Sequence, residues 1–228
     1  MATTLAKLIK DVQLIAASGP VPDDFRMSDR LVENWITQIR STLIAQGLEK
    51  RKDISDVWIQ TIGCLELETI DEAECCDIEI GCTLLRSVRQ IPTTIETKDS
   101  NLIIGVTGLD NTHITQTNRF KRRYKKYSRY TGSNKSWYLK DNYIYVINDS
   151  VLKYVNVHGI FDDPRELASF KNCSGEACFS FDSNYPVSAK MADSIVNVII
   201  QTKVKPFMTF PQDLSNDSEN KGINVIKE

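Results

Sequence analysis

The chain has 228 residues, 41% of them hydrophobic and 25% charged, which is typical of one folded globular domain or two small ones. A formal net charge of -2 excludes a protein that binds polyanions over its whole surface, so any contact with DNA or RNA has to be local. No stretch approaches the roughly 20 apolar residues of a membrane span, and the first residues lack the apolar segment of a signal peptide. We therefore expect synthesis in a cytosol and no membrane contact.

The first 66 residues have the apolar spacing of helices. Thr4 can cap a first helix whose apolar stripe runs to Ile15, and a Ser-Gly-Pro sequence follows it. Ser28 or Asp29 can cap a second helix, and Gly47 has the position of a residue just beyond its end. The buried stripe of this second helix is expected to be Leu31, Val32, Trp35, Ile36, Ile39 and Leu43.

A third helix is expected to begin at Asp53 or Ser55. Its inward residues are mostly three or four positions apart, as one face of a helix requires. They are Ile54, Val57, Trp58, Thr61, Ile62 and Leu65. None of the three helices can bury its stripe alone, so we expect them to pack together as an N-terminal bundle.

Short segments rich in β-branched and aliphatic residues follow Asp71. We expect five or six strands between residues 78 and 161. Two of them flank the turn Gly-Leu-Asp-Asn, two more form a hairpin around residues 140–142, and another has the sequence VLKYVNVHGIF. Alternation in that last strand places His158 on the face opposite to its valines.

Helical patterns return after residue 161. Asp163 precedes Pro164 at the start of a short helix, a longer helix is expected to end at Pro206, and a polar arm follows. The predicted fold is therefore α+β, with an N-terminal helical bundle, a central small antiparallel β region, a C-terminal helix and an extended polar arm. The corresponding segments, expected to form one structural unit, are residues 1–70, 71–161, 162–205 and 206–228.

No catalytic or cofactor motif is recognisable, since the sequence has no P-loop, G-x-S-x-G, H-E-x-x-H or G-x-G-x-x-G. His113 and His158 are interpreted as structural. The carboxylates between Glu66 and Glu79 are interpreted as a solvated face, because a metal-dependent nuclease needs two or three that converge from separate strands. We expect no enzyme activity, cofactor or metal, and an enzyme built on these acids is the less favoured alternative.

The six cysteines form no C-x-x-C pair, and neither histidine lies near one of them in the sequence. Reduced, partly buried thiols are therefore expected. The cysteines are Cys64, Cys75, Cys76, Cys82, Cys173 and Cys178.

We name residues 119–130 the basic run. Seven of these twelve residues are Lys or Arg, and four more are aromatic. Neither set of alternate residues is apolar enough for a core strand, so one interpretation is a solvated loop or a sheet edge guarded by charge. The other is phosphate contact with base stacking, without sequence-specific reading. The basic residues are Arg119, Lys121, Arg122, Arg123, Lys125, Lys126 and Arg129.

Several stretches follow one another along the chain in an informative order. They are SDRLVENWITQIRSTLIAQGLEK, DVWIQTIGCLELETID, GCTLLRSVRQIPTTIE, SRYTGSNKSWYLKDNYIYV, VHGIFDDPREL, YPVSAKMADSIVNVII and FPQDLSNDSEN. In this order they resemble the head-to-tail connector ring proteins of short-tailed DNA phages, and most closely the ring proteins of crAss-like phages. The resemblance covers nearly the whole chain and lies in the order of packing and turn signals.

The resemblance implies a non-catalytic virion protein of the neck or tail junction, made in the host bacterial cytoplasm. Roughly a dozen copies would form a ring under the portal protein, next to other connector or tail rings, with genomic DNA passing through the lumen. The polar arm would bind the portal through Phe207, Phe210, Leu214, Ile223, Val225 and Ile226.

Two contacts of the basic run agree with this resemblance, one with an acidic patch on a neighbouring ring and one with the DNA backbone in the lumen. The alternative to a ring protein is a non-sequence-specific nucleic-acid-binding protein that uses the basic run as its site.

Overall fold

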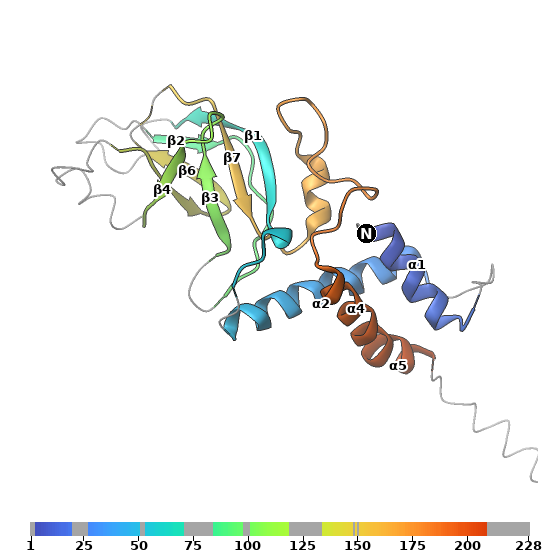
Figure 1. The fold of residues 1–228 in the computed structure, drawn as a ribbon. Coiled ribbons are helices and arrows are strands. Elements are labelled where there is room, and N and C mark those ends of the chain that lie inside the picture. Colours follow the sequence, from blue (N-terminus) through green and yellow to red (C-terminus); the bar gives the residue numbers. More distant parts are fainter. Residues whose placement is uncertain are drawn as a thin grey trace, which may run out of the picture.

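The computed structural model describes residues 3–19, 27–50, 53–70, 84–97, 101–118, 134–147, 149 and 151–208. These residues form a β-barrel with a layer of helices beside it (Figure 1). The strands are β1 (Gln60–Thr69), β2 (Leu84–Ser87), β3 (Ile103–Thr107), β4 (His113–Gln116), β5 (Ser136–Lys140), β6 (Tyr143–Ile147) and β7 (Tyr154–Gly159). The helices are α1 (Leu5–Ala16), α2 (Asp29–Glu49), α4 (Ala189–Ile199) and α5 (Lys205–Met208), with 3₁₀ turns η1 (Asp56–Trp58) and η3 (Pro164–Ser169) and a π-helical turn η4 (Ile200–Val204).

The barrel closes in the order β1-β2-β6-β5-β4-β3-β7, with β7 pairing back onto β1. Neighbouring strands are antiparallel except β4 and β5, which run parallel through the pairs Thr115–Ser136 and Gln116–Trp137. The predicted α+β fold, with an N-terminal helical bundle and a small antiparallel β region, is therefore wrong. A closed seven-stranded barrel is the main body of the described chain, and few helices accompany it.

The expected third helix is wrong because its residues form η1 and β1. The register of β1 with β7 shifts between Ile62 and Leu65, so that β1 advances three residues where β7 advances two. This bulge turns both side chains into the core, where Ile62 is 0% and Leu65 4% exposed. Residues on one face of a helix are also three or four positions apart, and the bulge therefore gives the apolar residues of this strand the spacing of a helix.

The other strand predictions are confirmed. The hairpin consists of β5 and β6, and its turn residues Asp141 and Asn142 have positive φ angles of 51° and 60°, as a type I′ turn requires. β3 and β4 flank the Gly-Leu-Asp-Asn turn, and β7 contains His158 on the face opposite to the buried valines. Six strands lie between residues 84 and 159, within the expected range.

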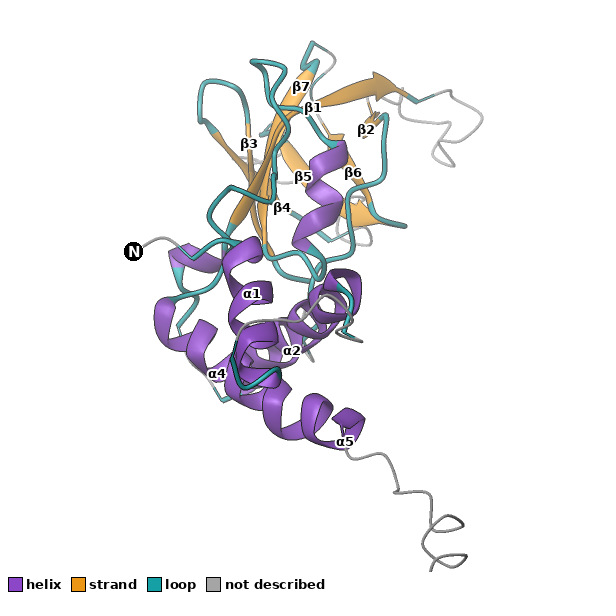
Figure 2. Cartoon of the chain, turned by 90° about the vertical axis from the view of Figure 1, so that its right-hand side faces the viewer, coloured by secondary structure: helices purple, strands orange, loops and turns teal. Residues whose placement is uncertain are grey.

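The helices α1, α2 and α4 pack on one another beside the barrel (Figure 2). The side chains of Thr4, Ser28 and Ser188 accept hydrogen bonds from backbone N–H groups in their first turns, which confirms the first two expected caps. Two expected helix ends are wrong. Gly47 is buried inside α2, and Pro206 lies within α5, which continues the helical segment of α4 and η4 without a break.

Arg40 of α2 connects the helical layer to the barrel. Its side chain is 0% exposed, and its Nε donates to the carbonyl of Pro186 at 3.2 Å and its Nη1 to the carbonyl of Phe161 at 2.8 Å. The guanidinium carbon also lies 5.9 Å from the ring centroid of Tyr185. Burial lowers the pKa of the Arg40 guanidinium, which reflects the cost of removing this cation from water. The two carbonyls and the ring offset part of that cost.

Arg165 of η3 forms a second connection to α2. Its Nη1 donates to Glu33 and its Nη2 to Asn34, each at 3.1 Å, and its Nε donates to Asp163 at 2.9 Å. The hydrogen bond to Asp163 is the main reason that the pKa of Arg165 is raised. Asp163 also accepts from the backbone N–H of Arg165, which confirms the predicted start of the short helix at Pro164.

A disulfide joins Cys64, in the bulge of β1, to Cys173, in the loop after η3. The prediction of reduced thiols is wrong for this pair, because the fold brings Cα atoms 109 positions apart in sequence to within 5.2 Å. Asn156 of β7 holds the bulge by accepting a hydrogen bond from the backbone N–H of Cys64 at 3.1 Å. Cys178 is the free cysteine among the described residues; the others, outside them, are Cys75, Cys76 and Cys82.

Replacement of Arg40 by Ala should lower the free energy of unfolding by about 3 kcal/mol, because it leaves two buried carbonyls without a donor and opens a cavity. Arg30→Ala, on an exposed position of the same helix, is the matched control and should cost less than about 0.5 kcal/mol. Urea denaturation followed by circular dichroism measures both. Similar, small effects of the two substitutions would contradict the bridging role of Arg40.

Cys173→Ser should lower the free energy of unfolding by up to about 4 kcal/mol in oxidising buffer, because the disulfide restricts a long loop of the unfolded chain. Dithiothreitol should reduce the Tm of the unmodified protein to that of the variant and leave the variant unchanged. Cys178→Ser is the control, and its Tm should still fall when reductant is added. A Tm of the unmodified protein that does not respond to reductant would show that the disulfide adds no stability.

Candidate assembly interface

Of the two predicted contact segments, the whole basic run and the part of the arm beyond Met208 lie outside the described residues. The described chain stops at Asn118, just after β4, and resumes at Asn134, just before β5. Both ends of the basic run are therefore attached where β4 and β5 pair. Of the arm, Phe207 lies in α5 without a described side chain, and the residues beyond the described range are Phe210, Leu214, Ile223, Val225 and Ile226.

The chain after the basic run is anchored by an ion pair. Lys135 Nζ contacts the carboxylate of buried Asp149, which also accepts from the backbone N–H groups of Val151 at 2.9 Å and Leu152 at 3.2 Å. Burial by itself raises the pKa of Asp149, but the Lys135 ammonium and the two N–H groups hold it below its usual range. The described chain therefore resumes, just before β5, next to a residue that is held to the rest of the barrel.

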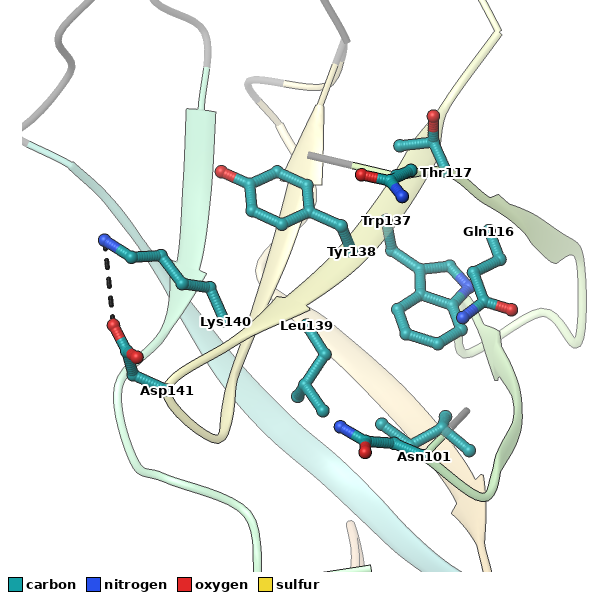
Figure 3. A pocket seen from close by; sticks show the side chains of 10 residues that line it. Asn101, Gln116, Thr117, Trp137, Tyr138, Leu139, Lys140 and Asp141 are labelled. Carbon is teal, nitrogen blue, oxygen red and sulfur yellow. Dashed lines mark ion pairs between the residues drawn. The ribbon is translucent and has the colours of Figure 1, made fainter. Parts of the chain in front are cut away.

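An open groove of about 690 Å³ lies along β5, next to the end of β4 (Figure 3). Trp137, which is 1% exposed, and Leu139 point into it, with Asn101 and Gln116 near them. An exposed Lys140–Asp141 pair, 3.7 Å apart, borders it. The half-buried Leu139 and the exposed amides of Asn101 and Gln116 offer packing and hydrogen bonds to a partner, whereas the Trp137 indole belongs to the core. The described residues of the groove provide no nucleophile with an adjacent base.

The outer face of the barrel near this groove is aromatic. Tyr138 and Tyr145 stack with ring centroids 4.9 Å apart and an interplanar angle of 6°. The guanidinium of Arg86 lies 5.2 Å from the ring centroid of Tyr143, and its Nη2 contacts Glu68 at 2.7 Å. Of the predicted acidic cluster, Glu68 is therefore engaged in an ion pair within the barrel wall, and residues 71–79 lie outside the described residues.

A second groove, which we name the acidic groove, lies between α1 and α4 and has a volume of about 550 Å³. It combines apolar side chains with two carboxylates. Its lining residues are Asp11, Leu14, Ile15, Asp193, Val196 and Asn197. In the described part of the chain neither carboxylate has a salt-bridge partner within 4.0 Å.

The prediction that Ile15 belongs to the buried stripe of the first helix is wrong. It is 52% exposed and Leu14 is 37% exposed, whereas the buried stripe of α1 ends at Val12. The last turn of α1 therefore presents two aliphatic side chains to the acidic groove instead of to the core. The sequence could not show this groove, because α1 and α4 come from opposite ends of the chain and each looks like an ordinary amphipathic helix.

His158 has a structural position. Nδ1 of His158 lies 2.8 Å from the hydroxyl of Thr61 and Nε2 lies 3.3 Å from the hydroxyl of Thr107, so His158 links the outer faces of β1 and β3. Its burial lowers its pKa. His113 is exposed in β4. Among the residues that the structure describes, no group of three or more His, Cys, Asp or Glu side chains is arranged to hold a metal ion.

A sequence profile of the family described as phage tail ring protein 2 matches residues 7–222 of the chain. No curated protein matches it at a significant level. In the described ranges, no helix is both long and apolar enough to cross a bilayer.

His158 should make the stability of the protein depend on pH. Because its pKa is lowered in the folded state, the unfolded chain takes up a proton first as the pH falls below about 6.5, and the free energy of unfolding should decrease between pH 7 and 5. His158→Gln keeps hydrogen-bonding capacity without titrating and should remove this component. Urea unfolding at a series of pH values measures it, with exposed His113→Gln as the control. An unchanged pH slope in His158→Gln would contradict the assignment.

Proposed function

Because the chain belongs to the phage tail ring protein 2 family of crAss-like phages, as its sequence indicated, we propose that it is one subunit of a ring at the head-to-tail junction. Membership of this family makes the chain a structural component of the virion. We propose further that about twelve copies dock under the portal protein, next to other rings, and that the genome passes through the lumen.

The observation that supports a ring is the combination of two unlike surfaces on one subunit. The acidic groove lies between α1 and α4, whereas the basic run is attached at β4 and β5, on the far side of the barrel from these helices (Figure 1). A cyclic ring is built from head-to-tail contacts, in which one surface of each subunit meets a different surface of the next. The family match extends over both parts of the fold.

The closed barrel suits such a subunit. Each of the seven strands has a neighbour on both sides, so contacts between subunits do not depend on pairing of free strand edges. The Arg40 and Arg165 connections fix the helical layer against the barrel. A rigid subunit is an advantage in a conduit, because the ring has to keep its shape while DNA moves through it.

The predicted arm has a role in this proposal as the segment that reaches the portal, since a polar segment that orders on binding can hold a ring on an uneven surface. The basic run keeps a second candidate role, contact with the DNA backbone in the lumen, because its seven arginines and lysines can bind phosphate groups.

The proposal is tested by mixing the full chain with the portal protein of its own phage and measuring the mass of the product by light scattering, with negative-stain images. We expect a complex in which about twelve chains form a ring on the portal. The same chain incubated with DNA of arbitrary sequence is the comparison. A chain that ignores the portal and binds DNA with a steep dependence on salt would instead favour a nucleic-acid-binding protein.

A further inference from the structure

We propose that the acidic groove of one subunit receives the basic run of the neighbouring subunit, and that this contact closes the ring. The inference rests on the proposed function, because it names the partner of each surface within that ring. The occupant is a second copy of this chain, and the segment that enters is Asn118–Gly132, between the described ends of β4 and β5.

The first argument is charge. Seven of the 28 basic residues lie in the basic run, which contains no acidic residue, so the rest of the chain has 21 basic residues against 30 acidic ones. The basic run of one copy is therefore attracted to the net acidic remainder of a second copy. It is repelled by the basic run of that copy, which has the same charge. Within that acidic remainder, Asp11 and Asp193 face the groove without a described ion-pair partner, and none of the described residues that line it is basic.

The second argument is the apolar content of both partners. Leu14 and Ile15 are exposed at the groove, and Val196 is buried beside them. Four of the twelve residues of the basic run are aromatic, which is more than electrostatic contact with a phosphate backbone requires. In the proposed contact, an aromatic side chain of the basic run packs on the aliphatic residues of the groove. The neighbouring Lys and Arg side chains then face the two carboxylates, so the interface has an apolar centre and a charged rim.

The third argument is topology. The basic run starts and ends at the β4–β5 junction, and β4 lies across the barrel from α1 and α4 (Figure 1). A segment of 15 residues that is anchored at both ends can extend at most roughly 25 Å from its base. Two complementary surfaces at opposite ends of one subunit meet when copies are joined head to tail. A ring repeats this heterologous contact between successive subunits.

The contact is tested with a labelled peptide of the sequence NRFKRRYKKYSRYTG. The receptor is the full chain carrying Lys121→Glu, Arg122→Glu and Lys125→Glu, so that its own basic run does not compete for the groove. We expect the peptide to bind this chain at physiological salt, and Asp11→Lys with Asp193→Lys to weaken binding by at least about tenfold. Asp11→Asn with Asp193→Asn, which conserves side-chain shape, should weaken it in the same direction.

A matched control is available on the same molecule. Asp53 and Asp56 are exposed and lie beside the exposed aliphatic residues Ile54 and Val57, but they line no described groove. Asp53→Lys with Asp56→Lys should leave peptide affinity within about twofold. Equal binding to the groove variants and their parent, or loss only in the control, would overturn the inference. Tight binding of the unmodified chain to DNA that the groove substitutions do not change would assign the basic run to the lumen.

Mixing of two defective chains tests the ring geometry. A groove-reversed chain keeps its basic run, and a run-reversed chain keeps its groove, so a mixture of the two should stop at a heterodimer, whereas each alone stays monomeric. Light scattering separates these products from the ring of the unmodified chain on its portal. Rings that form with the groove-reversed chain would refute the inference and leave the proposed function intact. If the unmodified chain forms no ring on the portal, the proposed function is wrong. The peptide titration then still shows whether the acidic groove binds the basic run.

Discussion

The buried guanidinium of Arg40 is the interaction on which the rest of the molecule depends. It reaches from α2 to the carbonyl of Phe161, after β7, and to the carbonyl of Pro186, before α4, so a single side chain holds the end of the barrel and the start of α4. A cation in a site with 0% exposure is costly, and the two hydrogen bonds and the nearby ring of Tyr185 offset part of that cost, although Nη2 has no hydrogen-bond partner among the described residues. Arg40 thereby holds the helical layer, which contains the acidic groove, against the barrel.

Closure of the barrel depends on two irregular points. On one side, the bulge at Cys64 lets β1 pair with β7 and carries the disulfide to Cys173. On the other side, β4 and β5 complete the circle through a short parallel pairing. The basic run connects the strands at that second point, with Lys135 fixed to Asp149 at its end. The basic run thus connects two strands that are joined by only two residue pairs.

In the proposed ring, the two surfaces would account for a strongly basic stretch in a chain with a net charge of only -2. Separation of charge within one subunit gives direction to its contacts, since like surfaces repel and unlike surfaces attract. The exposed aliphatic residues at Leu14 and Ile15 add an apolar contribution that charge alone lacks. Neither surface needs a catalytic group, and the histidine at position 158 serves the barrel by linking the outer faces of its strands.

Local signals in the sequence by themselves determined the caps at Thr4 and Ser28, the β5–β6 hairpin with its Asp-Asn turn, and the start of the short helix at Pro164, because neighbouring residues decide these features. The order of these signals was also enough to indicate the family. Only the tertiary structure decided that residues 60–69 form a strand, that Cys64 meets Cys173, and that α1 and α4 create a groove. Each of these depends on residues distant in sequence, and the bulge in β1 gave a strand the spacing of a helix.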